Sequence, residues 1–190
     1  MKPTLMEDEN FEKKDFRQTP LQQGDYEYCQ FNNCNFSTST LHLTRFLECV
    51  FTDCDLSNIE LQSVVFRDVK FMGCKMIGLK LSEATQCNGD IKFESCNLDF
   101  TSFYGKSLKA ANFINCQLKE ADFTDCNLTH AVFENCDLQD ARFDNTVLEF
   151  CDFRKSINYI IDPQKNRIRK AIFSLEGLPG LMQQFDIIIK

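Results

Sequence analysis

A large apolar side chain recurs at every fifth position over most of this 190-residue chain. From Phe11 to Leu81, fifteen consecutive positions of the series hold Phe, Leu, Tyr or Met. The series breaks at Gln86 and resumes two positions out of step, from Phe93 to Phe153. A period of five fits neither the ~3.6 residues of a helical turn nor the two of a strand. The backbone must therefore turn once per repeat, which predicts a flat-sided coil stacked on itself as a solenoid, with the large side chains filling its axis.

A smaller residue comes two positions before each large one, and we expect it to point inward as well, because the backbone between them is extended. Ten of the eleven cysteines occupy this slot. From Phe113 to Phe143, Ala precedes Phe and Cys precedes Leu, which keeps the volume of successive core layers nearly constant. In the second series the exceptions are the charged Lys106 and a two-residue insertion within residues 82–92. We expect irregular structure at both places.

The units ANFIN, ADFTD, CNLTH, CDLQD and ARFDN, between residues 111 and 145, resemble the A(D/N)LxX motif of pentapeptide-repeat proteins. The resemblance extends over residues 11–155. It implies an all-β fold, a right-handed quadrilateral β-helix with four five-residue sides per coil and about seven coils. The length favours a single domain, residues 1–190. We divide it into a first repeat run (11–81), a phase break (82–92), a second run (93–155) and an irregular last coil with a C-terminal cap (156–190).

The last residues, SLEGLPGLMQQFDIIIK, predict a short helix with Ser174 as its N-cap, followed by a terminal strand. A solenoid needs a cap over its open end. The segment also resembles the C-terminal part of Qnr-type quinolone-resistance proteins, where a helix and a strand join two rods, and this implies a candidate homodimer. The residues expected to form the cap or the dimer contact are Leu178, Leu181, Met182, Phe185, Ile187 and Ile189.

The cysteine pattern has two interpretations. Cys29 with Cys34, and Cys49 with Cys54, lie near the spacing of some zinc sites. Their inward slots favour core packing instead, because free cysteine behaves as a small apolar residue. An odd number of cysteines without a secretory signal indicates reduced thiols and a cytoplasmic location. We expect Cys87, within the insertion, to be the accessible thiol.

No catalytic, cofactor-binding or metal-binding site is expected. His42 and His130 are isolated at positions predicted to face outward, and no nucleophile accompanies either at a recognisable spacing. The sequence holds no phosphate-binding glycine loop, and a rod with a filled axis offers few concave pockets. We therefore interpret the protein as non-enzymatic and without a cofactor.

Negative charge is concentrated in one part of the chain. Residues 112–152 hold nine acidic side chains against two basic ones, which equals the net charge of -7 of the whole chain, whereas residues 154–170 hold six basic side chains against one acidic one. The negative balance argues against direct nucleic-acid binding and against docking on an anionic membrane. No stretch approaches the ~18 apolar residues that a membrane span needs. The candidate partner-binding residues are Asp122, Asp125, Glu134, Asp137, Asp140 and Asp144, together with Phe100 and Tyr104, which we expect on adjacent sides.

Two functional hypotheses follow. The first is a scaffold that binds another protein through the solenoid surface. The second rests on the Qnr-like resemblance, which implies a bacterial DNA mimic that binds DNA gyrase or topoisomerase IV, both type II topoisomerases, and protects them against quinolones. Regular carboxylates could imitate a phosphate backbone in the second case. This chain lacks the longer loops of Qnr-type proteins from Gram-negative bacteria, so both hypotheses stay open.

Overall fold

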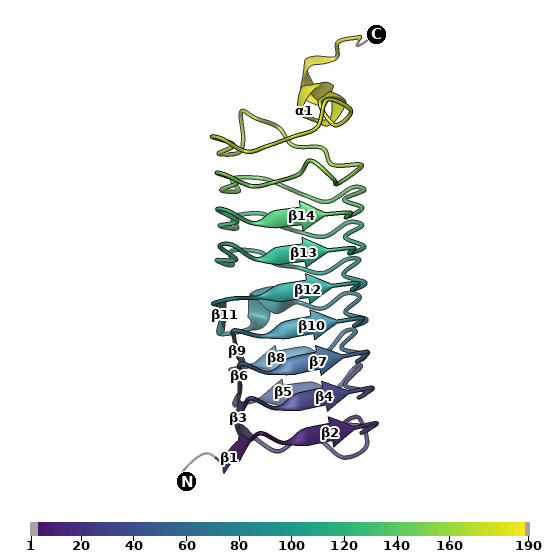
Figure 1. Cartoon of the computed structure of the whole chain (residues 1–190), viewed down its shortest axis with the longest axis vertical. Coiled ribbons are helices and arrows are strands. Elements are labelled where there is room, and N and C mark those ends of the chain that lie inside the picture. The colour runs from purple at the N-terminus through teal and green to yellow at the C-terminus, as the bar shows by residue number, and fades with distance from the viewer. Residues whose placement is uncertain (1–3, 189–190) are drawn as a thin grey trace.

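The structure is a computed structural model that describes residues 4–188, and it shows a rod of stacked coils (Figure 1). Each coil has four sides, and strands on the same side of successive coils pair in parallel. The predicted fold class, an all-β quadrilateral β-helix, is therefore confirmed. Within residues 4–188, no helix is long and apolar enough to cross a bilayer.

We number the four sides in chain order. Side 1 carries a five-stranded sheet of β1 (Thr4–Glu7), β3 (Gly24–Glu27), β6 (Thr44–Leu47), β9 (Val65–Arg67) and β11 (Gln86–Asn88). Side 2 carries a seven-stranded sheet of β2 (Asn10–Glu12), β4 (Gln30–Asn32), β7 (Val50–Thr52), β10 (Lys70–Met72), β12 (Lys92–Glu94), β13 (Asn112–Ile114) and β14 (Val132–Glu134). Side 3 is held by isolated bridges from Asp15 to Ile157. Side 4 carries β5 (Thr40–His42) and β8 (Glu60–Gln62), continued by bridges from Lys80 to Arg142.

The core is a set of side-chain columns along the rod axis. Because strands pair in register, Phe31 lies opposite Phe51, and Phe113 opposite Phe133. Neighbouring rings of the side 2 column are 4.7 to 5.4 Å apart between centroids, close to the spacing of strands in a sheet. Each stacked pair adds about 0.5–1.5 kcal/mol to the effect of burial. The rings of this column are Phe11, Phe31, Phe51, Phe71, Phe93, Phe113, Phe133, Phe153 and Phe173.

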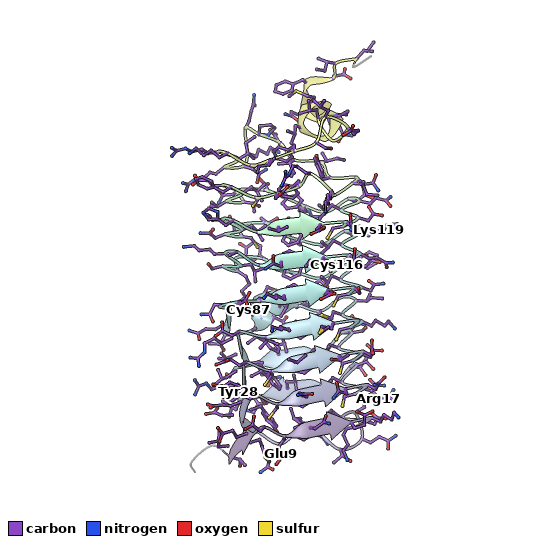
Figure 2. All side chains as sticks on the ribbon, viewed as in Figure 1. Glu9, Arg17, Tyr28, Cys87, Cys116 and Lys119 are labelled. Atoms are coloured by element: carbon purple, nitrogen blue, oxygen red, sulfur yellow. The ribbon has the colours of Figure 1, made fainter. Side chains whose placement is uncertain are left out.

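The backbone turns at the corners through left-handed residues. Two positions after most core residues, φ is positive: it is 52° at Asn33, 52° at Asp53 and 63° at Gly73. Asn, Asp and Gly tolerate this region better than other residues do, which explains why they recur at the corners. The inward thiols, such as Cys116, lie between the coils, and all eleven cysteines are free and buried (Figure 2).

The two inserted residues predicted within residues 82–92 are split, one before Cys87 and one after it. β11 pairs Cys87 in register with Phe66 of β9, and Gly89, two positions later, has the corner φ of 82°. Cys87 is therefore the core residue of its side, six residues from both Leu81 and Phe93. The 3-10 helix η1 (Leu81–Glu83) lies within the first interval. The prediction that Cys87 is accessible is wrong, because its side chain is buried in the core.

Lys106 is tolerated at its inward slot because its ammonium group reaches a backbone carbonyl in the irregular segment around η1. Its Nζ donates a hydrogen bond to the carbonyl oxygen of Ala84 at 2.5 Å, and Ala84 is the C-cap of η1. The side chain is half-buried rather than fully inside. His42, predicted to face outward, is also only partly exposed, and its Nδ1 is buried.

The C-terminal segment differs from its prediction. Ser174 Oγ accepts a hydrogen bond from the Gly177 backbone at 3.1 Å, but the helix α1 (Pro179–Met182) starts later and is followed by the 3-10 helix η2 (Gln183–Phe185). Residues 186–188 form no strand. Gly177 and Gly180 pack closely on Tyr159, where an added Cβ would clash.

Only part of the predicted cap covers the core. Leu181 is buried and Met182 packs against the core, so these two residues act as expected. Leu178, Phe185 and Ile187 are exposed, so they do not cover the core, and the predicted dimer contact is the role that remains for them. Ile189 lies outside the described residues. Tyr159, which was not predicted, is also buried at this end of the core, where its ring contacts Phe153 and Phe173.

Candidate protein-binding surface

The sequence-predicted carboxylates and aromatic residues gather on side 4. Three successive coils contribute residues 100–105, 120–125 and 140–145, which together we call the acidic side. Backbone bridges hold these segments in register, from Ser102 to Asp122 and from Asp122 to Arg142. At about 4.8 Å per coil, equivalent side chains form rows about 10 Å long. Six of the eight candidate partner-binding residues lie here: Phe100, Tyr104, Asp122, Asp125, Asp140 and Asp144.

Phe100 and Tyr104 occupy the two ends of the first segment. Phe100 is 52% exposed and occupies the corner between sides 3 and 4, with φ at 60°. Tyr104 is 51% exposed and directly precedes the next corner, Gly105. They therefore bracket one side instead of lying on adjacent sides, and the four peptide units between their Cα atoms span at most about 13 Å. Hydrogen bonding to Asp125 raises the pKa of the Tyr104 hydroxyl.

Two of the carboxylates on the acidic side have structural partners. Asp122 Oδ1 accepts a hydrogen bond from the backbone N–H of Thr124 at 3.0 Å, which is an Asx turn. Asp125 occupies the next corner, with φ at 57°, and its Oδ1 accepts a hydrogen bond from Asn145 Nδ2 at 2.6 Å. These interactions stabilise the coil, so Asp122 and Asp125 are less available to a partner than the sequence suggests.

The accessible negative charge comes from a different set. Glu120 and Asp140 occupy the same corner as Phe100 in the next two coils, and their φ angles are 54° and 58°. Asp144 projects near the other end of the side, and all three carboxylates belong to exposed residues. Within residues 4–188, these carboxylates make no side-chain hydrogen bond or ion pair. The corner row of Phe100, Glu120 and Asp140 therefore presents one apolar group followed by two free charges.

Glu134 and Asp137 do not join the acidic side. Glu134 belongs to β14 on side 2, the opposite side of the rod, and pairs with Lys155 at 2.5 Å. Asp137 lies on side 3, where its Oδ1 accepts hydrogen bonds from the backbone of Gln139 at 3.1 Å and from Asn158 at 2.7 Å. Both residues have structural partners, so we remove them from the candidate surface.

Sequence reasoning missed a stack on the corner between sides 1 and 2. The rings of His130 and Phe150 stack with centroids 4.6 Å apart, and Lys170 Nζ lies 5.3 Å from the Phe150 centroid. All three residues have positive φ. Their 20-residue spacing was the available signal, because residues one coil apart share a corner. Since Phe150 has a neighbour on each face, this stack is already satisfied within the chain.

The described part of the chain contains no group of three or more His, Cys, Asp or Glu side chains that could hold a metal ion. Burial raises the pKa of the thiols of Cys49, Cys126 and Cys151 to about 12. A thiol with so high a pKa is a poor nucleophile at neutral pH, because the thiolate is the reactive form.

Comparisons with known proteins agree with this architecture. A family model described as a pentapeptide repeat region matches residues 24–88 and 89–158. Two trypsin-treated forms of QnrB1, a plasmid-mediated fluoroquinolone resistance protein, are 14% and 16% identical, with TM-scores of 0.55 and 0.50. The first alignment covers 98% of this chain and 100% of QnrB1, and the second covers 97% and 99%.

A third solved structure is HetL, a pentapeptide repeat protein involved in heterocyst differentiation regulation from the cyanobacterium Nostoc sp. strain PCC 7120. It is 15% identical, with a TM-score of 0.41, over 93% of this chain and 89% of HetL. No match was found among proteins with curated functions. At these identities the likeness to the two QnrB1 structures establishes the fold alone.

Proposed function

The chain belongs to the pentapeptide-repeat family, and from this premise we propose that it is a non-catalytic rod that binds another protein through its acidic side. The observation that carries the proposal is the corner row of Phe100, Glu120 and Asp140, in which an exposed ring is followed by two unpaired carboxylates. The family establishes the scaffold only, because one fold supports many functions. The assignment therefore rests on the side chains of this chain.

Phe100 is unfavourable at its position in two ways. A left-handed conformation costs a residue other than Gly, Asn or Asp about 1–2 kcal/mol, and Phe100 has φ at 60°. Its ring also remains 52% exposed, so burial returns little of this energy. A strained residue at the surface motivates a functional hypothesis. Contact with a partner would bury the ring and offset the cost.

The free carboxylates indicate the chemistry of that partner. Glu120, Asp140 and Asp144 add negative potential to a rod that is acidic overall, with a net charge of -7. Such a field attracts a basic surface and orients it during encounter. We expect the partner to present Lys or Arg side chains along the rod axis and an apolar contact for Phe100.

Affinity capture with charge variants tests this proposal. The double variant Asp140→Lys/Asp144→Lys reverses two exposed charges on the acidic side. The matched control, Glu12→Lys/Glu94→Lys, makes the same change on side 2, where both residues are exposed. We expect a protein that the wild type and the control both capture and that the acidic-side variant loses. Equal capture by all three would refute the acidic side as the binding surface.

A second candidate function is binding to a type II topoisomerase as a DNA mimic. The acidic side favours it, and QnrB1, a fluoroquinolone resistance protein, shares the fold. The test is DNA supercoiling by purified gyrase over a wide range of protein concentration, with and without ciprofloxacin. Inhibition of supercoiling, or protection from the drug, would support this function. The absence of both effects would remove it and leave the general interaction protein.

The C-terminal segment is a second candidate binding surface and the place where we propose self-association. Leu175, Leu178, Phe185 and Ile188 are all exposed there. Several large apolar residues close together in a surface segment commonly mark an interaction site. We further propose a cytoplasmic location, because the eleven free thiols suit a reducing compartment.

A further inference from the structure

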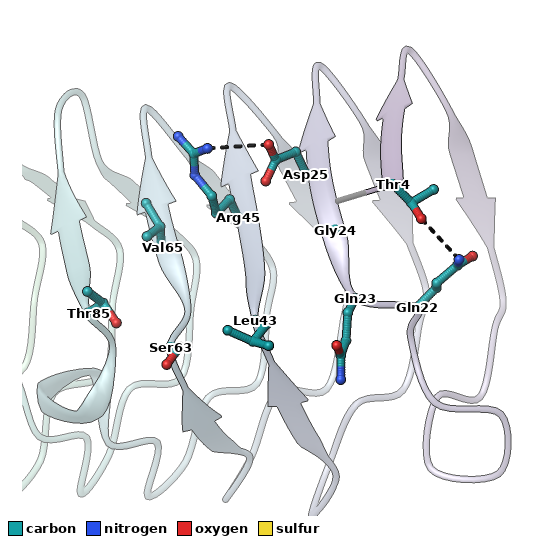
Figure 3. A pocket seen from close by; sticks show the side chains of 10 residues that line it. All are labelled: Thr4, Gln22, Gln23, Gly24, Asp25, Leu43, Arg45, Ser63, Val65 and Thr85. Carbon is teal, nitrogen blue, oxygen red and sulfur yellow. Dashed lines mark hydrogen bonds and ion pairs between the residues drawn. The ribbon is translucent and has the colours of Figure 1, made fainter. Parts of the chain in front are cut away.

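A groove crosses side 1 near the N-terminal end of the rod (Figure 3). It has a volume of about 780 Å³ and extends over five coils, from Thr4 to Thr85. Gly24 contributes to the hollow because its backbone lies against Thr4, and an added Cβ would be 2.2 Å from the Thr4 carbonyl oxygen. The groove lies on a different side from the acidic side, so the proposed function does not account for it.

Leu43 gives the groove an exposed apolar floor at an energetic cost. It lies in the bend between β5 and β6, with φ at 48°, and is 52% exposed. Branched apolar residues are rare in the left-handed region. Val65, on β9, is half-exposed and contributes a second apolar side chain. As at Phe100, strain and exposure coincide, and here both occur beside a hollow.

Arg45 gives the groove an accessible positive charge. It lies in register with Val65 on the neighbouring strand, so the charge adjoins the apolar floor. Its Nη1 lies 3.3 Å from Asp25 Oδ2, as the dashed line in Figure 3 shows. The Arg45 side chain is 49% exposed, whereas that of Asp25 is 18% exposed. The remaining N–H groups of the guanidinium can therefore bind a second carboxylate.

The same chain contains a segment with complementary chemistry. Residues 185–188 follow the cap as Phe-Asp-Ile-Ile, and Phe185, Ile187 and Ile188 are 46%, 56% and 85% exposed. Asp186 provides the carboxylate between the apolar residues. In Figure 1 this segment extends beyond the capped end of the rod, far from β1 and β3. Five coils separate the core residue Phe66 from Ile168 on side 1, or about 24 Å, so the segment cannot reach the groove of its own chain.

We propose that residues 185–188 of one copy bind in the groove of a second copy. The Asp186 carboxylate binds Arg45, and the isoleucines cover Leu43 and Val65. The contact joins the C-terminal end of one rod to the N-terminal half of another. Such a head-to-tail contact uses two different surfaces, so a pair of copies still has one free groove and one free tail, and open chains form. A tail-to-tail homodimer would instead leave the groove empty.

Complementary charge variants of the full chain test this arrangement by sedimentation velocity. Arg45→Glu disables the groove and keeps the tail, whereas the neutral variant Asp186→Asn disables the tail, keeps the groove and cannot form an ion pair with Glu at position 45. We expect wild-type assemblies that lengthen with concentration, and at least tenfold weaker association for each variant alone. An equimolar mixture of the two variants should form dimers and nothing longer, because one intact groove meets one intact tail. Arg67→Glu, outside the groove on β9, is the matched control and should assemble like the wild type.

A substitution of Leu43 separates the loss of binding from the loss of folding. Leu43→Asn removes the apolar floor and places at this corner a residue that tolerates positive φ, so its stability should be equal or higher while assembly is lost. Assembly of Arg45→Glu at wild-type strength would overturn the proposal in favour of tail-to-tail contact. A wild-type protein that stays monomeric at the highest soluble concentration would overturn it as well.

Discussion

Cys87 lies directly opposite Phe66 in the parallel pairing of β11 and β9, and both side chains are buried in the core. Burial raises the pKa of the Cys87 thiol to about 12. We therefore predict that Cys87 resists alkylation by iodoacetamide in the native protein at pH 8 and reacts promptly in denaturant. Peptide mapping by mass spectrometry measures both rates. Native labelling of Cys87 as fast as in the unfolded chain would contradict its place in the core.

The buried thiols also predict how stability depends on pH. In the unfolded chain a thiol titrates near 9.0, whereas burial raises the pKa of Cys49, Cys126 and Cys151 to about 12. The folded state thus favours the protonated form. Its stabilising contribution is fully present below pH 9 and is lost as pH rises toward 12. Melting temperatures should stay level from pH 7 to 8.5 and fall steeply above pH 9, less steeply in Cys151→Ala. A melting temperature that stays constant up to pH 11 would show that burial does not raise the pKa of these thiols.

Phe123 should be among the most costly residues to truncate. Its ring stacks between Phe103 at 4.8 Å and Phe143 at 5.1 Å and is completely buried. We expect Phe123→Ala to lower the free energy of unfolding by about 3–5 kcal/mol. Asp144→Ala, one position beyond Phe143 but exposed, should change it by less than ~0.5 kcal/mol. Urea denaturation measures both, and similar values would invalidate the assignment of inward and outward positions.

Phe100→Asn should stabilise the protein. Asn tolerates the left-handed corner, so relief of the strain should raise the free energy of unfolding by about 1 kcal/mol, and little buried apolar area is lost because the ring is exposed. The reverse change, Asn115→Phe, at a corner with φ at 54°, should destabilise by at least as much, because it also removes the hydrogen bond that Asn115 Oδ1 accepts from Asn135 Nδ2 at 3.1 Å. A variant Phe100→Asn that is less stable than the wild type would show that the ring stabilises the rod by packing against it. That result would contradict its assignment as a partner-binding residue.

The five-residue rule predicts the core because it acts at every position. Phe113 and Phe133 pair as the repeat requires, and the slots before them are as small as expected. The rule fails to locate one core residue, Cys87, because the intervals before and after it are six residues long instead of five. The strand that contains Cys87 nevertheless stays in register with β9. Gly89, the corner residue after Cys87, was the signal that would have located the core position.

The candidate surface was harder to predict because outward carboxylates with similar sequence surroundings have different roles. Asp122 precedes its core residue and accepts a backbone hydrogen bond in an Asx turn, whereas Asp144 follows its core residue and is exposed. This distinction depends on position within the repeat and could have been drawn from turn chemistry. The pairing of Glu134 with Lys155 could not, because the two residues are 21 positions apart and so occupy different positions within their repeats.

Site-specific photo-cross-linking tests the central claim most directly, because it reports which side of the rod a partner covers. A benzophenone amino acid replaces either Tyr104, 51% exposed on the acidic side, or Met72, 39% exposed on side 2. Both positions are outward, so neither replacement disturbs the core. We predict that the partner captured by the wild type cross-links through position 104 and not through position 72. Cross-linking through position 72 alone, or equally through both, would contradict the acidic side as the binding surface.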